Sequence, residues 1–333
     1  MFNGAATRRC PHPRAGAAVS DRSAWFDRYN TALQRLSPWI FRGVLATPPM
    51  AADPSGPVVL YTLLHKAGVR AYLLAAKSFL RFCPGLEVVV QSDGTLDEEA
   101  RDELQRHIEN VRILDRGVTD DFLREWLAGF SLGVDLSACR LFIPLKLVNV
   151  VARFPGRRVI LFDSDLLFLR RPDAVLQWID GASGSPSVFY GCGGSALAQT
   201  VRAMGFEFPR VDAARFNSGF CGFENIFTQH DLVPIFQRIA AHDRTLFAKA
   251  WSTEQVIWSV LLNRFENVLE LNRLGRGYHG GAWDRYGDLA RHATYTHFVG
   301  SDRFRNFSYP RLAWRVIREL QGRGTSPAWR PAG

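Results

Sequence analysis

The chain has 333 residues, of which 47% are hydrophobic, 12% aromatic and 22% charged, and its formal net charge is +9. The length fits one large domain or two small ones, and the composition is that of a globular protein. No stretch reaches the roughly 18 consecutive apolar residues of a membrane-spanning helix. Only four residues are lysine, and the arginines are spread along the chain rather than clustered with aromatic residues. This distribution argues against nucleic acid as a partner and favours anionic substrates or a membrane surface.

The chain ends and the cysteines carry a second set of exclusions. Residues 1–22 are rich in Ala, Arg and Pro without the apolar segment of a secretory signal peptide, and we expect a disordered tail there. The five cysteines are scattered without a C-x-x-C pair, which favours a reducing compartment over a disulfide scaffold. We therefore expect a cytoplasmic protein, with peripheral association at the inner face of a membrane as a further option. Residues 23–57 are expected to form a helical extension, and residues 323–333 a second disordered tail.

The first half of the chain alternates between two hydrophobic periodicities. Strands are expected at 58–64, 86–90, 111–114 and 159–162, and helices at 69–83, 95–108 and 137–154. Thr95 and Glu98 match a capping box at the start of the second helix. Pro144 is expected early in the third helix or at a kink in it. The order β-α-β-α-β-α-β is typical of a parallel sheet with helices on both faces.

The second half has shorter expected elements. Strands are expected at 188–190, 217–223, 268–271 and 294–298, and helices at 231–242, 253–263 and 310–321. No repeat and no low-complexity linker separates the two halves. We therefore expect one α/β domain over residues 58–322, with a mostly parallel central sheet, helices on both faces and an elaborated C-terminal half.

The sequence Asp163-Ser164-Asp165 follows the apolar strand 159–162 directly, and a second apolar run follows it. Ligands of open α/β sheets bind beyond the carboxyl ends of the strands. Two carboxylates at such an end can approach one hard cation, and Mg²⁺ or Mn²⁺ with substrate phosphates is the usual occupant. Acids between buried runs need a partner, and a cation supplies one. The alternative is a pair of solvated turn acids.

A second candidate group closes the last expected strand, where His297 precedes Gly300 and Arg303. A neutral imidazole can be a third metal ligand, and an arginine can bind a diphosphate through its planar fork. The alternative is a half-buried histidine at a strand end.

Taken in order, these motifs resemble glycosyltransferase family 8, the retaining glycogenin and bacterial lipopolysaccharide galactosyltransferase group with the GT-A fold. Asp163-Ser164-Asp165 after its strand looks like the family's metal-binding D-x-D, and His297-x-x-Gly300-x-x-Arg303 matches its H-x-x-G-x-x-K element with Arg for Lys. The remaining matches are Cys139-Arg140-Leu141, similar to an aromatic-Ala-Arg-Leu segment; Phe216-Asn217-Ser218-Gly219-Phe220, similar to F-N-[AS]-G; and Glu254-Gln255, in the place of Asp-Gln. The resemblance spans about residues 58–309. The loop 64–67 departs from it, because the family's polar Asn-Asp-x-Tyr pattern is missing there.

The resemblance implies a metal-dependent transfer from a nucleotide diphosphate sugar, by family habit a UDP-sugar, with retention of the anomeric configuration. Asp163, Asp165 and His297 would hold Mn²⁺ or Mg²⁺. Gln255 would lie beside the anomeric carbon, with Glu254 and Asn217 as further catalytic candidates. The donor would contact Thr62, Arg140, Asp163, Ser164, Asn217, Ser218, Gly219, Gly300 and Arg303. The acceptor could be a glycan, a lipid-linked molecule or a small molecule.

Two other functions stay open. A nucleotidyltransferase usually carries a Gly-rich basic loop after its first strand, whereas Leu63 to Gly68 holds one Lys and one Gly. A catalytically silent nucleotide- or sugar-binding protein of the same fold has no physical need to keep buried acids together. For Asn217 to Gly219 the alternative is a plain turn, and for Glu254 it is an acid favoured by the helix dipole.

Overall fold

The computed structural model describes residues 32–33, 35–192, 202–213, 215–249, 252–275, 278–281, 284–304 and 306–322. The expected tails at 1–22 and 323–333, and the first residues of the expected extension, lie outside these ranges. Within them, no helix combines the length and the apolar character that crossing a membrane requires.

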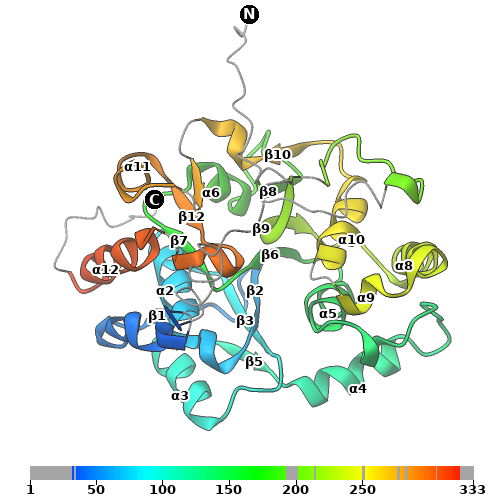
Figure 1. Cartoon of the computed structure of the whole chain (residues 1–333), viewed down its shortest axis with the longest axis horizontal. Coiled ribbons are helices and arrows are strands. Elements are labelled where there is room, and N and C mark those ends of the chain that lie inside the picture. The colour runs from blue at the N-terminus through cyan, green and yellow to red at the C-terminus, as the bar shows by residue number, and fades with distance from the viewer. Residues whose placement is uncertain are drawn as a thin grey trace, which may run out of the picture.

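A seven-stranded sheet forms the centre of the molecule (Figure 1). Its strands are β2 (Val58–Leu64), β3 (Glu87–Ser92), β5 (Arg112–Leu114), β6 (Arg158–Phe162), β8 (Val188–Cys192), β9 (Phe216–Glu224) and β10 (Val268–Glu270). They lie in the order β10-β8-β9-β6-β2-β3-β5. All neighbouring pairs are parallel except those of β9, which runs antiparallel to β6 and to β8. The expected mostly parallel α/β sheet is confirmed.

Helices cover both faces of this sheet because its inner strands are apolar on both sides. Val88 and Ile160 belong to one buried cluster, whereas their neighbours Val89 and Leu161 belong to another. The first cluster packs under α2 (Val69–Leu80), α3 (Glu98–His107), α6 (Asp173–Ile179) and α12 (Ser308–Leu320). The second packs under α4 (Arg116–Trp126), α5 (Asn149–Arg153), α8 (Gln229–Asp243) and α10 (Ser252–Leu262). The two groups of helices stand on opposite sides of the sheet in Figure 1.

Shorter elements complete the fold. They are the helical turns η1 (Arg42–Ala46), η2 (Lys66–Gly68), η3 (Leu136–Ala138), η4 (Phe142–Val148), η5 (Leu271–Leu274) and η6 (Gly300–Phe304), and the helices α9 (Leu246–Lys249) and α11 (Tyr286–His292). Two small sheets pair β1 (Met50–Ala51) with β4 (Ile108–Glu109), and β11 (His279–Gly281) with β12 (Tyr295–His297) and β7 (Leu166–Phe168). Phe41 and Val44, from the expected extension, are wholly buried in the same cluster as α2 and α12.

Two local expectations are wrong. The helix α3 is capped by Asp97, whose carboxylate accepts a hydrogen bond from the Ala100 amide at 3.1 Å, because Thr95 instead accepts one from the Lys66 amide at 2.9 Å. The expected helix 137–154 is interrupted: η3 is followed by the π-helical turn η4 and then by α5. Pro144 lies inside η4, where its missing N–H cannot support a regular α-helical turn. The pattern also missed α4, α6, α11 and the strand β7.

Candidate metal and donor site

Three separate parts of the chain meet at the end of β6. Asp163 to Asp165 form the turn between β6 and β7. The strand β12 runs antiparallel to β7 and places His297 opposite Leu166, and the Phe298 amide donates to the Asp165 carbonyl at 3.0 Å. On the other side, the Asp163 amide donates to the Gly219 carbonyl of β9 at 2.7 Å. Backbone pairing from two sheets therefore brings the D-x-D, F-N-S-G and His297 motifs together.

Asp163, Asp165 and His297 form a group whose ligand atoms all lie within 4.8 Å of one another. His297 Nε2 is 3.0 Å from Asp165 Oδ1 and 3.7 Å from Asp163 Oδ2. Neither Asp165 Oδ1 nor His297 Nε2 has a hydrogen-bond partner of acceptable geometry among the described residues, although both are buried. Two carboxylates and an imidazole that converge with unsatisfied atoms suit a divalent cation such as Mn²⁺ or Mg²⁺.

The second oxygen of each acid is held by a cationic side chain. Lys146 Nζ donates to Asp163 Oδ1 at 2.7 Å, and the Arg303 guanidinium donates to Asp165 Oδ2 at 2.6 Å. Burial alone would raise the pKa of Asp165, but the Arg303 guanidinium and the neighbouring His297 ring hold it well below its ordinary value. The Asp163 side chain is 36% exposed, whereas those of Asp165 and His297 are 8% and 3% exposed. Asp163 therefore forms the open side of the site.

Lys146 is the one residue of this group that the sequence motifs did not predict. It lies in η4, within an apolar run, and its side chain is buried. Burial opposes its charge, yet the carboxylates of Asp163 and Glu254 raise its pKa above the ordinary lysine value. A lysine in the middle of a buried run needs a counter-charge, and that was the signal available in the sequence. Its π-helical turn is of a kind often found at functional sites.

Gly219 lies directly against the converging ligands. A Cβ on this residue would stand 2.3 Å from His297 Cε1 and 2.5 Å from Asp163 Oδ2. The Gly219 amide donates to Asn217 Oδ1 at 2.7 Å, so Asn217 uses its carboxamide oxygen inside the strand. Asn217 itself is buried opposite Gly191, where β8 and β9 shift register. Only glycine lets β9 approach the acids this closely.

Glu254 and Gln255 are buried residues near the start of α10, the helix that packs against β9. Ser218 Oγ donates to Glu254 Oε2 at 2.8 Å, while Glu254 Oε1 and Gln255 Oε1 are buried without a hydrogen-bond partner among the described residues. Burial raises the pKa of Glu254 to about 7, although Lys146 and Ser218 act in the opposite direction. The structure thus brings Glu254 to the group that contains Lys146 and Asp163, and Gln255 is its buried neighbour on α10.

The other expected donor residues have different surroundings. Thr62 is buried within β2, and its hydroxyl donates to the Phe162 carbonyl at 2.7 Å, so it supports the end of β6 rather than offering a surface to a ligand. Arg140 is exposed, and its Nε donates to the Ala248 carbonyl at 3.1 Å, which turns it toward α9. Ser164 is half-buried in the D-x-D turn, and Gly300 has a left-handed backbone with φ of 68°. Lys146 contacts Asp163 and Arg303 contacts Asp165, whereas Arg140 hydrogen-bonds elsewhere.

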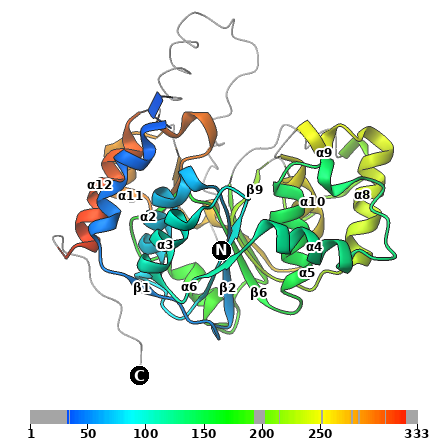
Figure 2. The same cartoon turned by 90° about the horizontal axis from the view of Figure 1, so that it is seen from below.

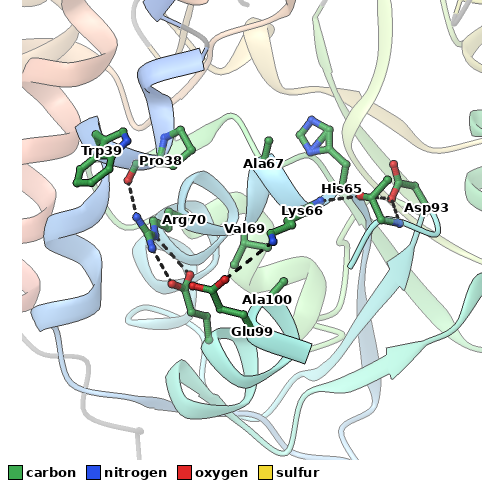
Figure 3. A pocket seen from close by; sticks show the side chains of 12 residues that line it. Pro38, Trp39, His65, Lys66, Ala67, Val69, Arg70, Asp93, Glu99 and Ala100 are labelled. Atoms are coloured by element: carbon green, nitrogen blue, oxygen red, sulfur yellow. Dashed lines mark hydrogen bonds and ion pairs between the residues drawn. The ribbon is translucent and has the colours of Figure 1, made fainter. Parts of the chain in front are cut away.

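A cavity of about 630 Å³ opens where β2 and β3 end. Trp39 stands at one end of it and His65 and Asp93 at the other, with Arg70 between them (Figure 3). Burial lowers the pKa of His65, and the charge of Arg303 lowers it further, against Asp93. His65 and Arg303 are therefore close enough to interact electrostatically, although the cavity lining itself includes neither Arg303 nor the D-x-D turn.

Comparison with known proteins gives structural likenesses alone: no family model and no curated protein matches the chain. The structure of the galactosyltransferase LgtC with donor and acceptor sugar analogs matches 80% of this chain and 99% of its own at 16% identity, with a TM-score of 0.45. Mouse xyloside xylosyltransferase 1 in its apo form matches 74% of this chain and 97% of its own at 14% identity, with a TM-score of 0.44. Core-mannan synthase A from Aspergillus fumigatus, in a Mn/GDP form, matches 67% of this chain and 75% of its own at 12% identity, with a TM-score of 0.42. Because each of these TM-scores is below 0.5, the function proposed below is argued from the residues of this chain alone.

Proposed function

We propose that this protein is a metal-dependent glycosyltransferase that moves a sugar from a nucleotide diphosphate sugar, with a UDP-sugar as the donor, to an acceptor hydroxyl. The observation that carries the proposal is the convergence of Asp163 Oδ2, Asp165 Oδ1 and His297 Nε2; the last two are buried 3.0 Å apart and have no well-aligned hydrogen-bond partner among the described residues. Free thiols at Cys83, Cys139 and Cys221 support a reducing, cytoplasmic setting.

The site is suited to stabilising a diphosphate leaving group. A bound Mn²⁺ or Mg²⁺ would supply Lewis-acid stabilisation of the negative charge that develops there. Arg303 and Lys146 fix the two acids so that one oxygen of each faces His297. Preorganised charges of this kind act without reorganisation during the reaction. We propose the cavity beside His65 as the binding place for the nucleoside of the donor.

The residues of β9 and α10 are proposed to face the sugar. Gln255 offers a buried carboxamide oxygen without a partner in the described part of the chain. An amide cannot deprotonate an acceptor, but it can stabilise positive charge at the anomeric carbon. As the bond to the leaving phosphate breaks, the acceptor hydroxyl can attack the anomeric carbon from that same side and pass its proton to the departing phosphate oxygen, so the anomeric configuration is retained. Glu254 is held by Ser218 beside Lys146, which suits a positioning role better than that of an exposed base.

The proposal is tested first by binding. Isothermal titration of UDP should give tight binding with Mn²⁺ and weak binding without it. Asp165→Asn should remove the Mn²⁺ dependence of UDP binding, because a charged carboxylate ligand is replaced by a neutral carboxamide. The matched control is Asp173→Asn, an exposed acid at the start of α6 whose side chain is 71% exposed, and it should behave as the wild type. Equal UDP affinity with and without Mn²⁺ in the wild type would overturn the metal assignment.

A second experiment tests turnover. A panel of nucleotide sugars should show slow Mn²⁺-dependent hydrolysis for one donor, lost in Asp165→Asn and kept in Asp173→Asn. Mn²⁺-dependent UDP binding without hydrolysis of any donor, and without transfer to any offered acceptor, would identify a catalytically silent protein of this fold. Release of pyrophosphate from a nucleoside triphosphate and a sugar phosphate would identify a nucleotidyltransferase instead.

A further inference from the structure

Two helical segments lie side by side at one edge of the molecule, residues 35–46 and α12 (Figure 2). Trp314 Nε1 donates to the Ile40 carbonyl at 3.1 Å, and a Cβ on Gly43 would lie 3.4 Å from Ile317. Because residues three apart on one segment meet residues three apart on the other, the two segments run parallel. The exposed residues of the two segments are called here the tryptophan–arginine face: Arg35, Leu36, Trp39, Arg42, Arg311, Trp314 and Arg318, of which Trp39 also lines the cavity beside His65.

The apolar part of this face is exposed to solvent. The inner side of α12 is buried, as Leu312 and Val316 show. On the outer side, Trp39 is 64% exposed, Leu36 is 50% exposed and Trp314 is 45% exposed. Single exposed apolar residues are ordinary on a protein surface, whereas several large ones on two adjacent segments are the kind of surface that interaction sites present.

The charged part of the same face is one-sided. Residues 35–43 and 308–322 contain five arginines and a single acid, Glu319. That acid is already paired, with Arg81 at 2.8 Å and with Arg315 at 2.9 Å. The Arg311 guanidinium lies 3.8 Å from the centre of the Tyr286 ring. Arg35, Arg42 and Arg318 form no ion pair with any residue that the structure describes, so within the described part of the chain their positive charge is not compensated.

We propose that the tryptophan–arginine face binds the surface of a membrane that contains anionic lipids. Tryptophan is favoured at the boundary between head groups and acyl chains, where its ring is buried and its N–H stays near polar groups. Arginine pairs with lipid phosphates through its planar fork. An apolar patch surrounded by unpaired arginines therefore has the charge complementarity that an anionic bilayer requires. The inference does not depend on the proposed transferase activity.

Vesicle co-sedimentation of the full-length protein tests this inference. The protein should bind vesicles of equal parts phosphatidylglycerol and phosphatidylcholine, and should not bind pure phosphatidylcholine vesicles. Binding should weaken as salt rises, because the attraction between exposed charges is screened. The double variant Arg42→Glu/Arg318→Glu should weaken binding at least about tenfold, since each basic residue near an anionic surface contributes a factor of roughly five.

Controls separate a specific face from general positive charge. The control variant Arg106→Glu/Arg124→Glu changes the net charge by the same amount, but at exposed arginines of α3 and α4. Its vesicle binding should stay within about twofold of the wild type. Leu36→Asp tests the apolar part and should also weaken binding, while circular dichroism confirms that each variant is folded. Absence of binding to the anionic vesicles, or equal losses in the two double variants, would overturn the proposal. Vesicle binding by a protein without any nucleotide-sugar activity would leave this inference standing and reject the proposed function alone.

Discussion

Replacing Gly219 by alanine tests the geometry of the site most directly. The added Cβ would stand 2.3 Å from His297 Cε1, 2.5 Å from Asp163 Oδ2 and 2.8 Å from Asn217 Oδ1. Ordinary contacts between such atoms begin near 3.5 Å, so the two ligand side chains would have to withdraw by roughly 1 Å each. A displacement of that size destroys their convergence on one cation. We expect Mn²⁺ affinity to fall at least about 100-fold, the upper end of what misplacing the support of a metal ligand costs.

The same substitution also overfills a packed interior, which typically costs about 1–3 kcal/mol of stability. Gly222→Ala provides a matched control on the same strand. Its Cβ would lie 2.3 Å from Phe189 Cε1 and 2.7 Å from Phe189 Cζ, which is an equal overlap without any metal ligand. Both variants should therefore lose a similar free energy of unfolding, but only Gly219→Ala should lose metal affinity.

Two measurements give the answer. Free Mn²⁺ is followed by electron paramagnetic resonance during a titration, and stability by urea unfolding with circular dichroism. A folded Gly219→Ala protein that binds Mn²⁺ as tightly as the wild type would refute the reasoning. Equal losses of metal affinity in Gly219→Ala and Gly222→Ala would do the same, because the effect would then be general destabilisation.

Three further predictions concern the charges around this site. Lys146→Met leaves Asp163 and Glu254 without their cation, so the free energy of unfolding, measured in denaturant titrations, should fall by about 3 kcal/mol. Mn²⁺ should restore part of this loss, because the metal ion would replace the lysine as the positive charge beside Asp163. An identical loss with and without Mn²⁺ would contradict this. Burial raises the pKa of Glu254 from 4.5 to about 7, so between these values the unfolded chain gives up a proton that the folded chain keeps, and stability falls as pH rises. Glu254→Gln cannot titrate and should gain stability relative to the wild type between pH 5 and pH 8, measured by unfolding at both values; a constant difference would mean that the acid is already charged at pH 5. Transfer should keep the donor's anomeric configuration, read from the proton coupling in the first-formed product, and inversion would promote Glu254 to catalytic base.

Much of the framework was determined by the sequence alone. The strand β2 has the bounds that its apolar run predicted, 58–64, and the D-x-D turn directly follows the predicted strand 159–162. Such strands are buried on both faces, so nearly every residue in them is apolar and the signal is local and strong. The motifs that contain Asp163, Ser218, Glu254 and His297 were likewise visible in the sequence, since each is complete within a few consecutive residues, and the roles of these residues stay predictions.

The partners of those residues were decided only by the tertiary structure. Lys146 contacts Asp163 from seventeen residues away, whereas Arg140 donates to Ala248 in another part of the chain. The packing of Gly219 against His297 joins β9 to a strand of a different sheet. A hydrophobic pattern reports which side of an element is buried, but not how a π-helical turn rotates a lysine or how two sheets meet. Those contacts require elements far apart in the sequence to be placed to within a few tenths of an ångström, and only the packing of the whole molecule determines that placement.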